Sequence, residues 1–144
     1  FAYGRLPLAF SARCFTARAH RLAKDNCEFR CKHASEGLLL HTLEGDAFLN
    51  INGIQIQSAH SLNLLGQIDD LRKMGVERLR LVPQAERTAE VIELFHNALN
   101  ADIEIDGAQN GLQQLTTDTL CNGYWHEQPG MYWHSDDNKT LTRE

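Results

Sequence analysis

The sequence predicts an α/β fold from three local patterns. Leu49 and Ile51 alternate with polar residues, an Asn-Gly pair follows, and the alternation then resumes, which is typical of a β-hairpin. Two later segments carry apolar residues at helical spacing. A short apolar run lies between them, at residues 76–82, and predicts a strand. Because a helix, a strand and a helix follow one another, we expect parallel strands joined by crossover connections.

The first third of the chain contains fewer regular elements. Residues 1–3 have the composition of a strand interior, whereas residues 5–36 lack a strong apolar period and predict a loop with a short helix near residues 16–23. Residues 38–43 predict a further strand. The Asn-Gly pair at residues 52–53 tolerates the positive φ angles of a type I′ turn, so we expect the hairpin to turn there.

The remaining elements are bounded by capping and breaking residues. Ser61 predicts the start of a helix that ends at Gly75, and Pro83 closes the strand that comes next. A second helix is predicted over residues 88–100, where apolar side chains recur every three to four positions. A weaker helical pattern covers residues 109–117.

The composition is that of one ordinary globular domain. The chain has 144 residues, of which 42% are apolar and 23% charged, and its apolar runs are far too short for a membrane span. No basic segment followed by an apolar one opens the sequence, so we expect the reducing environment of the cytoplasm. The first residue is not Met, and we therefore expect the chain to be part of a longer protein.

Charge is unevenly distributed along the chain. The formal net charge is −5, yet residues 1–33 contain only Asp25 and Glu28 as acids among many cations. These cations are Arg5, Arg13, Arg18, Arg21, Lys24, Arg30 and Lys32. A basic block of this kind indicates a phosphate-rich partner or an anionic cofactor.

Three of the four cysteines lie inside this basic block. Cys14, Cys27 and Cys31 are separated by twelve and three residues, so three thiolates within one short segment could wrap a single metal centre. Thiolate ligands select zinc or an iron–sulfur cluster. The paired Cys-x2-Cys knuckles of zinc ribbons do not occur, whereas iron–sulfur clusters accept more irregular spacings. Neighbouring cations would also stabilise the negative charge of such a cluster.

The spacing does not determine a fourth ligand. Cys121 is one candidate, and His20, His33 or a cysteine outside this chain are the others. Cys121 stands alone in the sequence, and an isolated cysteine is more often a small buried apolar residue than a ligand. No Gly-x-Ser-x-Gly elbow, His-Glu-x-x-His pair or phosphate-binding glycine loop occurs, so the sequence indicates no catalytic residues.

Three parts of the sequence resemble the collagenase-like peptidase family. They are Arg5–Cys14 together with Cys27 and Cys31, the stretch Gly75–Leu81 in its helix–strand–helix setting, and Cys121–Trp125. The resemblance spans most of the chain, and the spacing of the three cysteines is its most specific element. Within the family, this spacing is closest to that of proteins of oxygen-independent ubiquinone biosynthesis.

The resemblance implies that residues 1–144 are the C-terminal half of one TIM-type (β/α) barrel domain. Residues 1–36 would be its cysteine-bearing segment, residues 37–134 its α/β segment and residues 135–144 a polar tail. A half-barrel exposes strand edges and apolar faces. We therefore expect either completion by association with a second copy or a compact remnant with a mobile cysteine segment.

The resemblance also implies a cofactor and partners. Cys14, Cys27 and Cys31 match three ligands of a [4Fe-4S] cluster, and the fourth would lie outside this chain unless Cys121 substitutes. Such proteins pair with a sister protein of the same family and support ring hydroxylation of an apolar ubiquinone precursor without dioxygen. The alternatives are a collagenase-like peptidase and a zinc-stabilised, RNA-associated binding module. We expect a hydroxylase subunit without peptidase activity.

Overall fold

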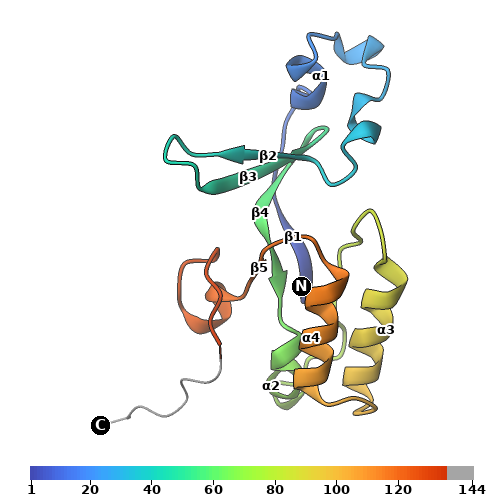
Figure 1. Ribbon diagram of the computed structural model, residues 1–144, viewed down its shortest axis with the longest axis vertical. Helices are drawn as coiled ribbons and strands as arrows, with labels where there is room; N and C mark the ends of the chain where they lie inside the picture. The colour runs from blue at the N-terminus through green and yellow to red at the C-terminus, as the bar shows by residue number, and fades with distance from the viewer. Residues whose placement is uncertain (136–144) are drawn as a thin grey trace.

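The computed structural model describes residues 1–135, which form a sheet with helices packed around one end (Figure 1). The strands are β1 (Tyr3–Phe10), β2 (Leu38–His41), β3 (Ala47–Asn52), β4 (Gln55–Asn63) and β5 (Leu120–Cys121). The α-helices are α1 (Phe15–Ala19), α2 (Ile68–Lys73), α3 (Thr88–Leu99) and α4 (Ile105–Leu115). Short 3-10 helices complete the described elements: η1 (Lys24–Asn26), η2 (Arg30–His33), η3 (Leu65–Gln67) and η4 (Gly123–His126).

β4 is the central strand of an open, mainly antiparallel sheet. The sheet order is β1-β4-β3-β2, and β5 pairs with β4 in a parallel direction. The α/β class is therefore confirmed. Among residues 1–135, the expected parallel pairing is limited to β4 with β5 and to a bridge between Tyr3 and Leu81, whereas β1 to β4 pair antiparallel and form no barrel. The predicted hairpin makes β3 and β4 antiparallel, because its tight turn returns β4 directly beside β3 and leaves no length of chain for a crossover helix.

The predicted hairpin is confirmed, with its turn one residue further along the chain. Because Asn52 pairs with Gln55, the two loop residues are Gly53 and Ile54. Gly53 has a φ of +63°, and a glycine at the first loop position is typical of a type II′ turn rather than the expected type I′ turn. β2 extends the sheet on the far side of β3, close to the predicted position.

The helix predicted from Ser61 begins later than the sequence indicates. Ser61 and Asn63 belong to β4, and the helical region starts only with η3 and α2. The Asn63 side-chain oxygen accepts a hydrogen bond from the Leu65 N–H at 2.9 Å, which turns the chain out of the strand. The Ser61 hydroxyl donates to Asp118 instead of capping a helix, so a long-range contact decides its role.

The strand predicted at residues 76–82 is reduced to one bridge, in which Leu81 pairs in parallel with Tyr3. Residues 5–10, which the sequence assigns to a loop, instead belong to β1. Pro7 lies between two shifts in the register of β1 against β4. Such irregularities are where a strand tolerates proline. β1 therefore pairs with β4 although its sequence contains Pro7 and lacks a regular apolar period.

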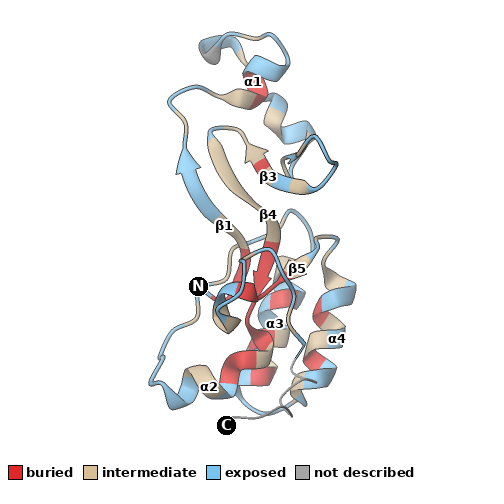
Figure 2. Cartoon of the chain, turned by 90° about the vertical axis from the view of Figure 1, so that its left-hand side faces the viewer, coloured by how far each residue is buried: buried red, intermediate tan, exposed pale blue. Residues whose placement is uncertain are grey.

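The core lies where α3 and α4 cover the ends of β1 and β4. Val91, Phe95 and Ala98 from α3 are 2–4% exposed, and Ala108 and Leu112 from α4 are fully buried. Figure 2 shows buried residues gathered at this end of the molecule, while the opposite end is mostly exposed. α3 agrees with the predicted helix. α4 begins at Ile105, before its predicted start, and Asp106 in its first turn is an acidic residue of the kind that favours a helix N-terminus.

No helix within residues 1–135 is long and apolar enough to cross a membrane. Ser135, the first residue of the predicted polar tail, is exposed. The rest of that tail, residues 136–144, lies outside the described residues.

Candidate functional site

Residues 11–37 form a lobe beyond the end of the sheet, which we call the cysteine lobe (Figure 1). It contains α1, η1 and η2 and joins β1 to β2. Thr16 and Ala17 anchor it to the hairpin: each is 2% exposed, and the Thr16 hydroxyl accepts a hydrogen bond from Gly53 N–H at 3.2 Å. Apart from these two, no described residue of the lobe is buried. Little apolar packing therefore fixes the conformation of the lobe.

Cys14 is the N-cap residue of α1. Its Sγ accepts a hydrogen bond from Ala17 N–H at 3.4 Å, a weak contact because sulfur is a poor acceptor. Cys27 follows η1, and Cys31 lies within η2. All three are half-buried free thiols, so they are available to a metal or an oxidant.

The three cysteines are not gathered into one site. Within residues 1–135, no three His, Cys, Asp or Glu side chains lie together in a group that could hold a metal ion. The residue types fit a thiolate-bound metal or cluster, but their arrangement does not. Cys14, Cys27 and Cys31 therefore stay predicted ligands.

The backbone between Cys27 and Cys31 is strained. Glu28 and Phe29 have φ angles of +54° and +51°, values that residues other than glycine rarely adopt. Each such residue costs about 1 kcal/mol or more relative to an ordinary conformation. Strain of this kind is found preferentially in segments that bind a ligand or change conformation.

The cysteine lobe presents mainly positive charge. A surface hollow of about 510 Å3 lies beside Cys14 and is lined by Arg13, Arg18 and Arg21. Arg30 pairs with Glu28 at 2.6 Å, with both side chains about half-exposed. Exposed pairs of this type contribute little to stability and neutralise only one of the cations. The lobe therefore keeps a positive potential that attracts an anionic group.

The candidate fourth ligands do not join the three cysteines. Cys121 lies in β5, apart from the cysteine lobe, and is 2% exposed (Figure 1). Burial raises the pKa of its thiol to about 11, so the group stays protonated at neutral pH. A cysteine ligates metal as the thiolate, which favours the interpretation of Cys121 as a buried apolar residue. His20 and His33 are exposed residues at the ends of α1 and η2.

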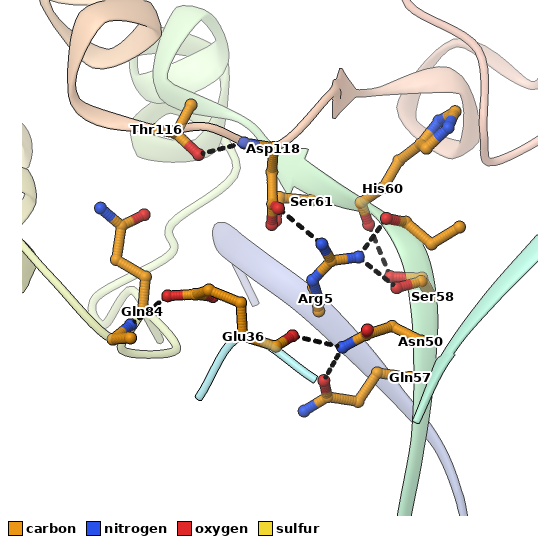
Figure 3. A network of polar contacts seen from close by, with 12 residues as sticks. Arg5, Glu36, Asn50, Gln57, Ser58, His60, Ser61, Gln84, Thr116 and Asp118 are labelled. Carbon is orange, nitrogen blue, oxygen red and sulfur yellow. Dashed lines mark hydrogen bonds and ion pairs between the residues drawn. The ribbon is translucent and has the colours of Figure 1, made fainter. Parts of the chain in front are cut away.

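A polar network at the centre of the sheet holds the strands below the lobe (Figure 3). The Arg5 guanidinium donates to Asp118 Oδ1 at 2.5 Å and to the Ser58 carbonyl at 3.1 Å, and it also contacts the Ala59 carbonyl. The Ser61 hydroxyl donates to Asp118 Oδ2 at 2.5 Å. The ion pair is nearly buried, because the two charged side chains are 13% and 16% exposed.

The same region ties the end of the cysteine lobe to the sheet. The Asn50 amide donates to the Glu36 carbonyl at 2.8 Å and to the Gln57 side-chain oxygen at 3.0 Å. The Glu36 carboxylate accepts from Ala85 N–H at 2.6 Å, so Glu36 links the lobe to the segment that leads into α3 (Figure 3). Asn50 is itself 1% exposed, which makes its two contacts structurally important.

A hollow of about 310 Å3 opens beside this network and is lined partly by Glu36, Arg87 and Asp118. Most polar groups of the network already have protein partners, although Arg5 Nε is buried without one. The network therefore acts first as a structural joint. Sequence reasoning missed it because Arg5 and Asp118 lie 113 residues apart and share no local pattern.

The comparison with known families agrees with the resemblance of the cysteine segment. Residues 1–135, which include the cysteine lobe, the sheet and the helices, match the family model described as Peptidase family U32. No solved structure matches the chain. Because the family match covers nearly the whole sequence, the chain belongs to peptidase family U32.

Proposed function

We propose that this chain is a UbiV-like iron–sulfur component of oxygen-independent ubiquinone biosynthesis. It would support anaerobic hydroxylation of an apolar ubiquinone precursor together with a UbiU-like protein of the same family. Membership of the family supports the proposal. The spacing of Cys14, Cys27 and Cys31 supports this branch of the family over its peptidases.

The observation that carries the proposal is the presence of three free thiols in one cationic lobe. Cys14, Cys27 and Cys31 would hold a [4Fe-4S] cluster, which supplies one-electron transfer when bound. The arginines of the lobe would stabilise its negative charge. The fourth ligand would come from outside this chain, because Cys121 is buried as a neutral thiol.

Binding would require the cysteine lobe to rearrange. Cys14 would give up its weak hydrogen bond from Ala17 N–H. The strained residues Glu28 and Phe29 would relax, which would offset part of the cost of gathering Cys27 and Cys31. Since few side chains of the lobe are buried, such a change would leave the helical core intact.

Metal and sulfide analysis of the intact protein, purified without oxygen, tests this proposal. We expect iron, acid-labile sulfide and broad visible absorbance, all strongly reduced by Cys27→Ser. Cys121→Ser is the matched control and should leave the iron content unchanged, because its thiol lies outside the lobe. An intact protein that contains neither iron nor sulfide would overturn the proposal.

The cationic lobe also favours a second candidate, a zinc-stabilised and RNA-associated binding module. Zinc without iron or sulfide in the same analysis would support it, as would RNA affinity that falls steeply with salt. Phe15 and Phe29 are the lobe's only aromatic residues, so it offers a small platform for stacking bases. Peptidase activity, the remaining alternative, has no supporting motif in the sequence.

The barrel and the cytoplasmic location belong to the same proposal. The parallel contacts between Tyr3 and Leu81 and between β4 and β5 are pairings that a (β/α) barrel could extend. A second copy or the UbiU-like partner would supply the missing strands. A well-folded monomer in size-exclusion chromatography would count against completion by a second copy.

A further inference from the structure

The segment that follows β5 lies against the sheet and borders a surface hollow of about 220 Å3. The sheet contributes Leu6 and Leu8 from β1 and Leu49 from β3, and the segment contributes Tyr124 and Met131. In Figure 1, this segment lies on the opposite side of β4 and β5 from α3 and α4. The hollow is therefore separate from the helical core and from the cysteine lobe.

The lining of this hollow is apolar and uncharged. Among the described residues that line it, none is Asp, Glu, Lys or Arg. Leu8 and Phe48 are each 54% exposed although they border the hollow, so the described chain leaves this apolar surface uncovered. Small-molecule sites typically combine an apolar lining with a few placed polar groups.

The segment over the hollow is held in place by specific contacts. Gly123 N–H donates to the Tyr132 carbonyl at 2.9 Å, which folds the segment back on itself. A Cβ atom on Gly130 would lie 2.3 Å from the Tyr124 ring, so only glycine lets this ring lie against the backbone there. Tyr124 is 68% exposed and stands at the edge of the hollow.

The polar groups of the lining point to a neutral ligand that donates a hydrogen bond. His60 Nδ1 lies 2.9 Å from the Met131 carbonyl, which can only accept, so Nδ1 carries the proton. In the neutral ring, Nε2 then keeps its lone pair and can accept from a hydroxyl group. Cys121 adds an uncharged thiol to the lining.

The volume of the hollow limits the size of the ligand. An apolar cavity of about 150 Å3 holds one benzene molecule. A hollow of about 220 Å3 therefore holds one six-membered ring with a short substituent.

We propose that this hollow binds the ring of a neutral phenol that carries an apolar substituent, with His60 as the acceptor for its hydroxyl group. The inference deepens the proposed function and rests on it for the identity of the natural ring, an apolar ubiquinone precursor. Binding of the ring itself needs no metal. The two ideas can therefore fail separately.

Calorimetric titration of the full chain with 2-prenylphenol tests the site. We expect saturable binding that Ala47→Leu weakens about tenfold, because the larger side chain fills the hollow. Ala9→Leu is the matched control: Ala9 is exposed on β1 and does not line the hollow, so binding should stay within about twofold. Leu8→Asn, at a half-exposed position that tolerates a polar residue, should weaken binding as well.

The hydroxyl group is tested with prenylbenzene, which lacks it. We expect wild-type protein to prefer 2-prenylphenol several-fold, and His60→Phe to remove that preference while prenylbenzene still binds. Absence of binding to wild-type protein, or equal weakening by Ala47→Leu and Ala9→Leu, would overturn the inference. A dimer disrupted by Leu8→Asn, without ring binding, would overturn it in favour of a second copy. Ring binding by a protein without iron would support the site and contradict the proposed function.

Discussion

Arg5 and Asp118, which lie 113 residues apart in the sequence, form a nearly buried ion pair at 2.5 Å. The pair joins β1, at the start of the chain, to the segment that leads into β5. Ser61 in β4 donates to the second carboxylate oxygen, so one carboxylate links β1, β4 and the segment before β5 (Figure 3). The centre of the sheet is therefore held by a polar joint as well as by apolar packing.

Asp118→Asn should destabilise the protein by about 3 kcal/mol, because it leaves the Arg5 guanidinium nearly buried without its charged partner. Asparagine is the conservative replacement, since it keeps an oxygen that can accept from Ser61. The measurement is urea unfolding followed by circular dichroism. The urea concentration at the midpoint of unfolding should fall, while the slope of the unfolding free energy against urea concentration stays unchanged.

Asp69→Asn is the matched control for this substitution. Asp69 pairs with Arg72 at 2.9 Å, but its side chain is 65% exposed and that of Arg72 is 53% exposed. An exposed pair contributes at most about 1 kcal/mol, so the control should lose little stability. Equal losses of stability in the two variants would show that burial of the Arg5–Asp118 pair does not increase its contribution to the free energy of unfolding.

Local sequence patterns predicted the elements whose conformation depends mainly on neighbouring residues. The hairpin at Gly53 follows from turn chemistry, and α3 follows from its apolar period. Ser61 was assigned wrongly because its capping chemistry is used across the sheet, by Asp118. Among residues 1–135, the parallel pairing expected from the order of helices and strands is limited to β4 with β5 and to the Tyr3–Leu81 bridge. That order does not show how β1 and β2 join the predicted hairpin, and both do so antiparallel.

The candidate site was predictable only as a set of residue types. The sequence shows that Cys14, Cys27 and Cys31 share a basic segment, and the structure places them in one lobe. The sequence did not show that these three cysteines lie apart from one another. Short turns with little apolar content carry no periodicity that fixes their relative positions. The hollow beside Cys121 was likewise invisible, since its lining comes from four separate parts of the chain.

The four thiols should differ sharply in their reaction with iodoacetamide. The thiols of Cys14, Cys27 and Cys31 are half-buried and should be alkylated in the folded protein, whereas Cys121 is 2% exposed and should stay protected. Mass spectrometry of proteolytic fragments measures the extent at each cysteine. Protein unfolded in urea is the control, in which all four should react. Early alkylation of Cys121 in folded protein would contradict its burial.

Cys121 should also make stability fall at alkaline pH. Its pKa is raised from 9.0 to about 11 by burial, so between these values the unfolded chain has released a proton that the folded protein retains. Rising pH therefore favours unfolding across this window. Below it, the stability that the protonated thiol contributes to the folded protein is fully present. Cys121→Ala should show a smaller drop in melting temperature between neutral and strongly alkaline pH. An identical drop in both proteins would contradict the assignment.

Gly37→Ala should loosen the attachment of the cysteine lobe. Gly37 has a φ of +91°, and a Cβ atom there would lie 2.5 Å from the Asn50 amide, which holds the Glu36 carbonyl. Backbone strain should cost about 1–3 kcal/mol. The clash with a nearly buried amide should add about 1 kcal/mol more, because that side chain has little room to move. Urea unfolding measures the total.

Gly45→Ala separates these two contributions. Gly45 has a similar φ of +97°, but nothing lies within 4 Å of the position that its Cβ would occupy. It therefore reports backbone strain alone, and the difference between the variants reports the clash with Asn50. Limited proteolysis supplies the second measurement: Gly37→Ala should speed cleavage within residues 11–37, because the Asn50 contact no longer fixes the end of the lobe, whereas Gly45→Ala should not. Equal cleavage rates would mean that the lobe is held by α1 and the Thr16 contact instead.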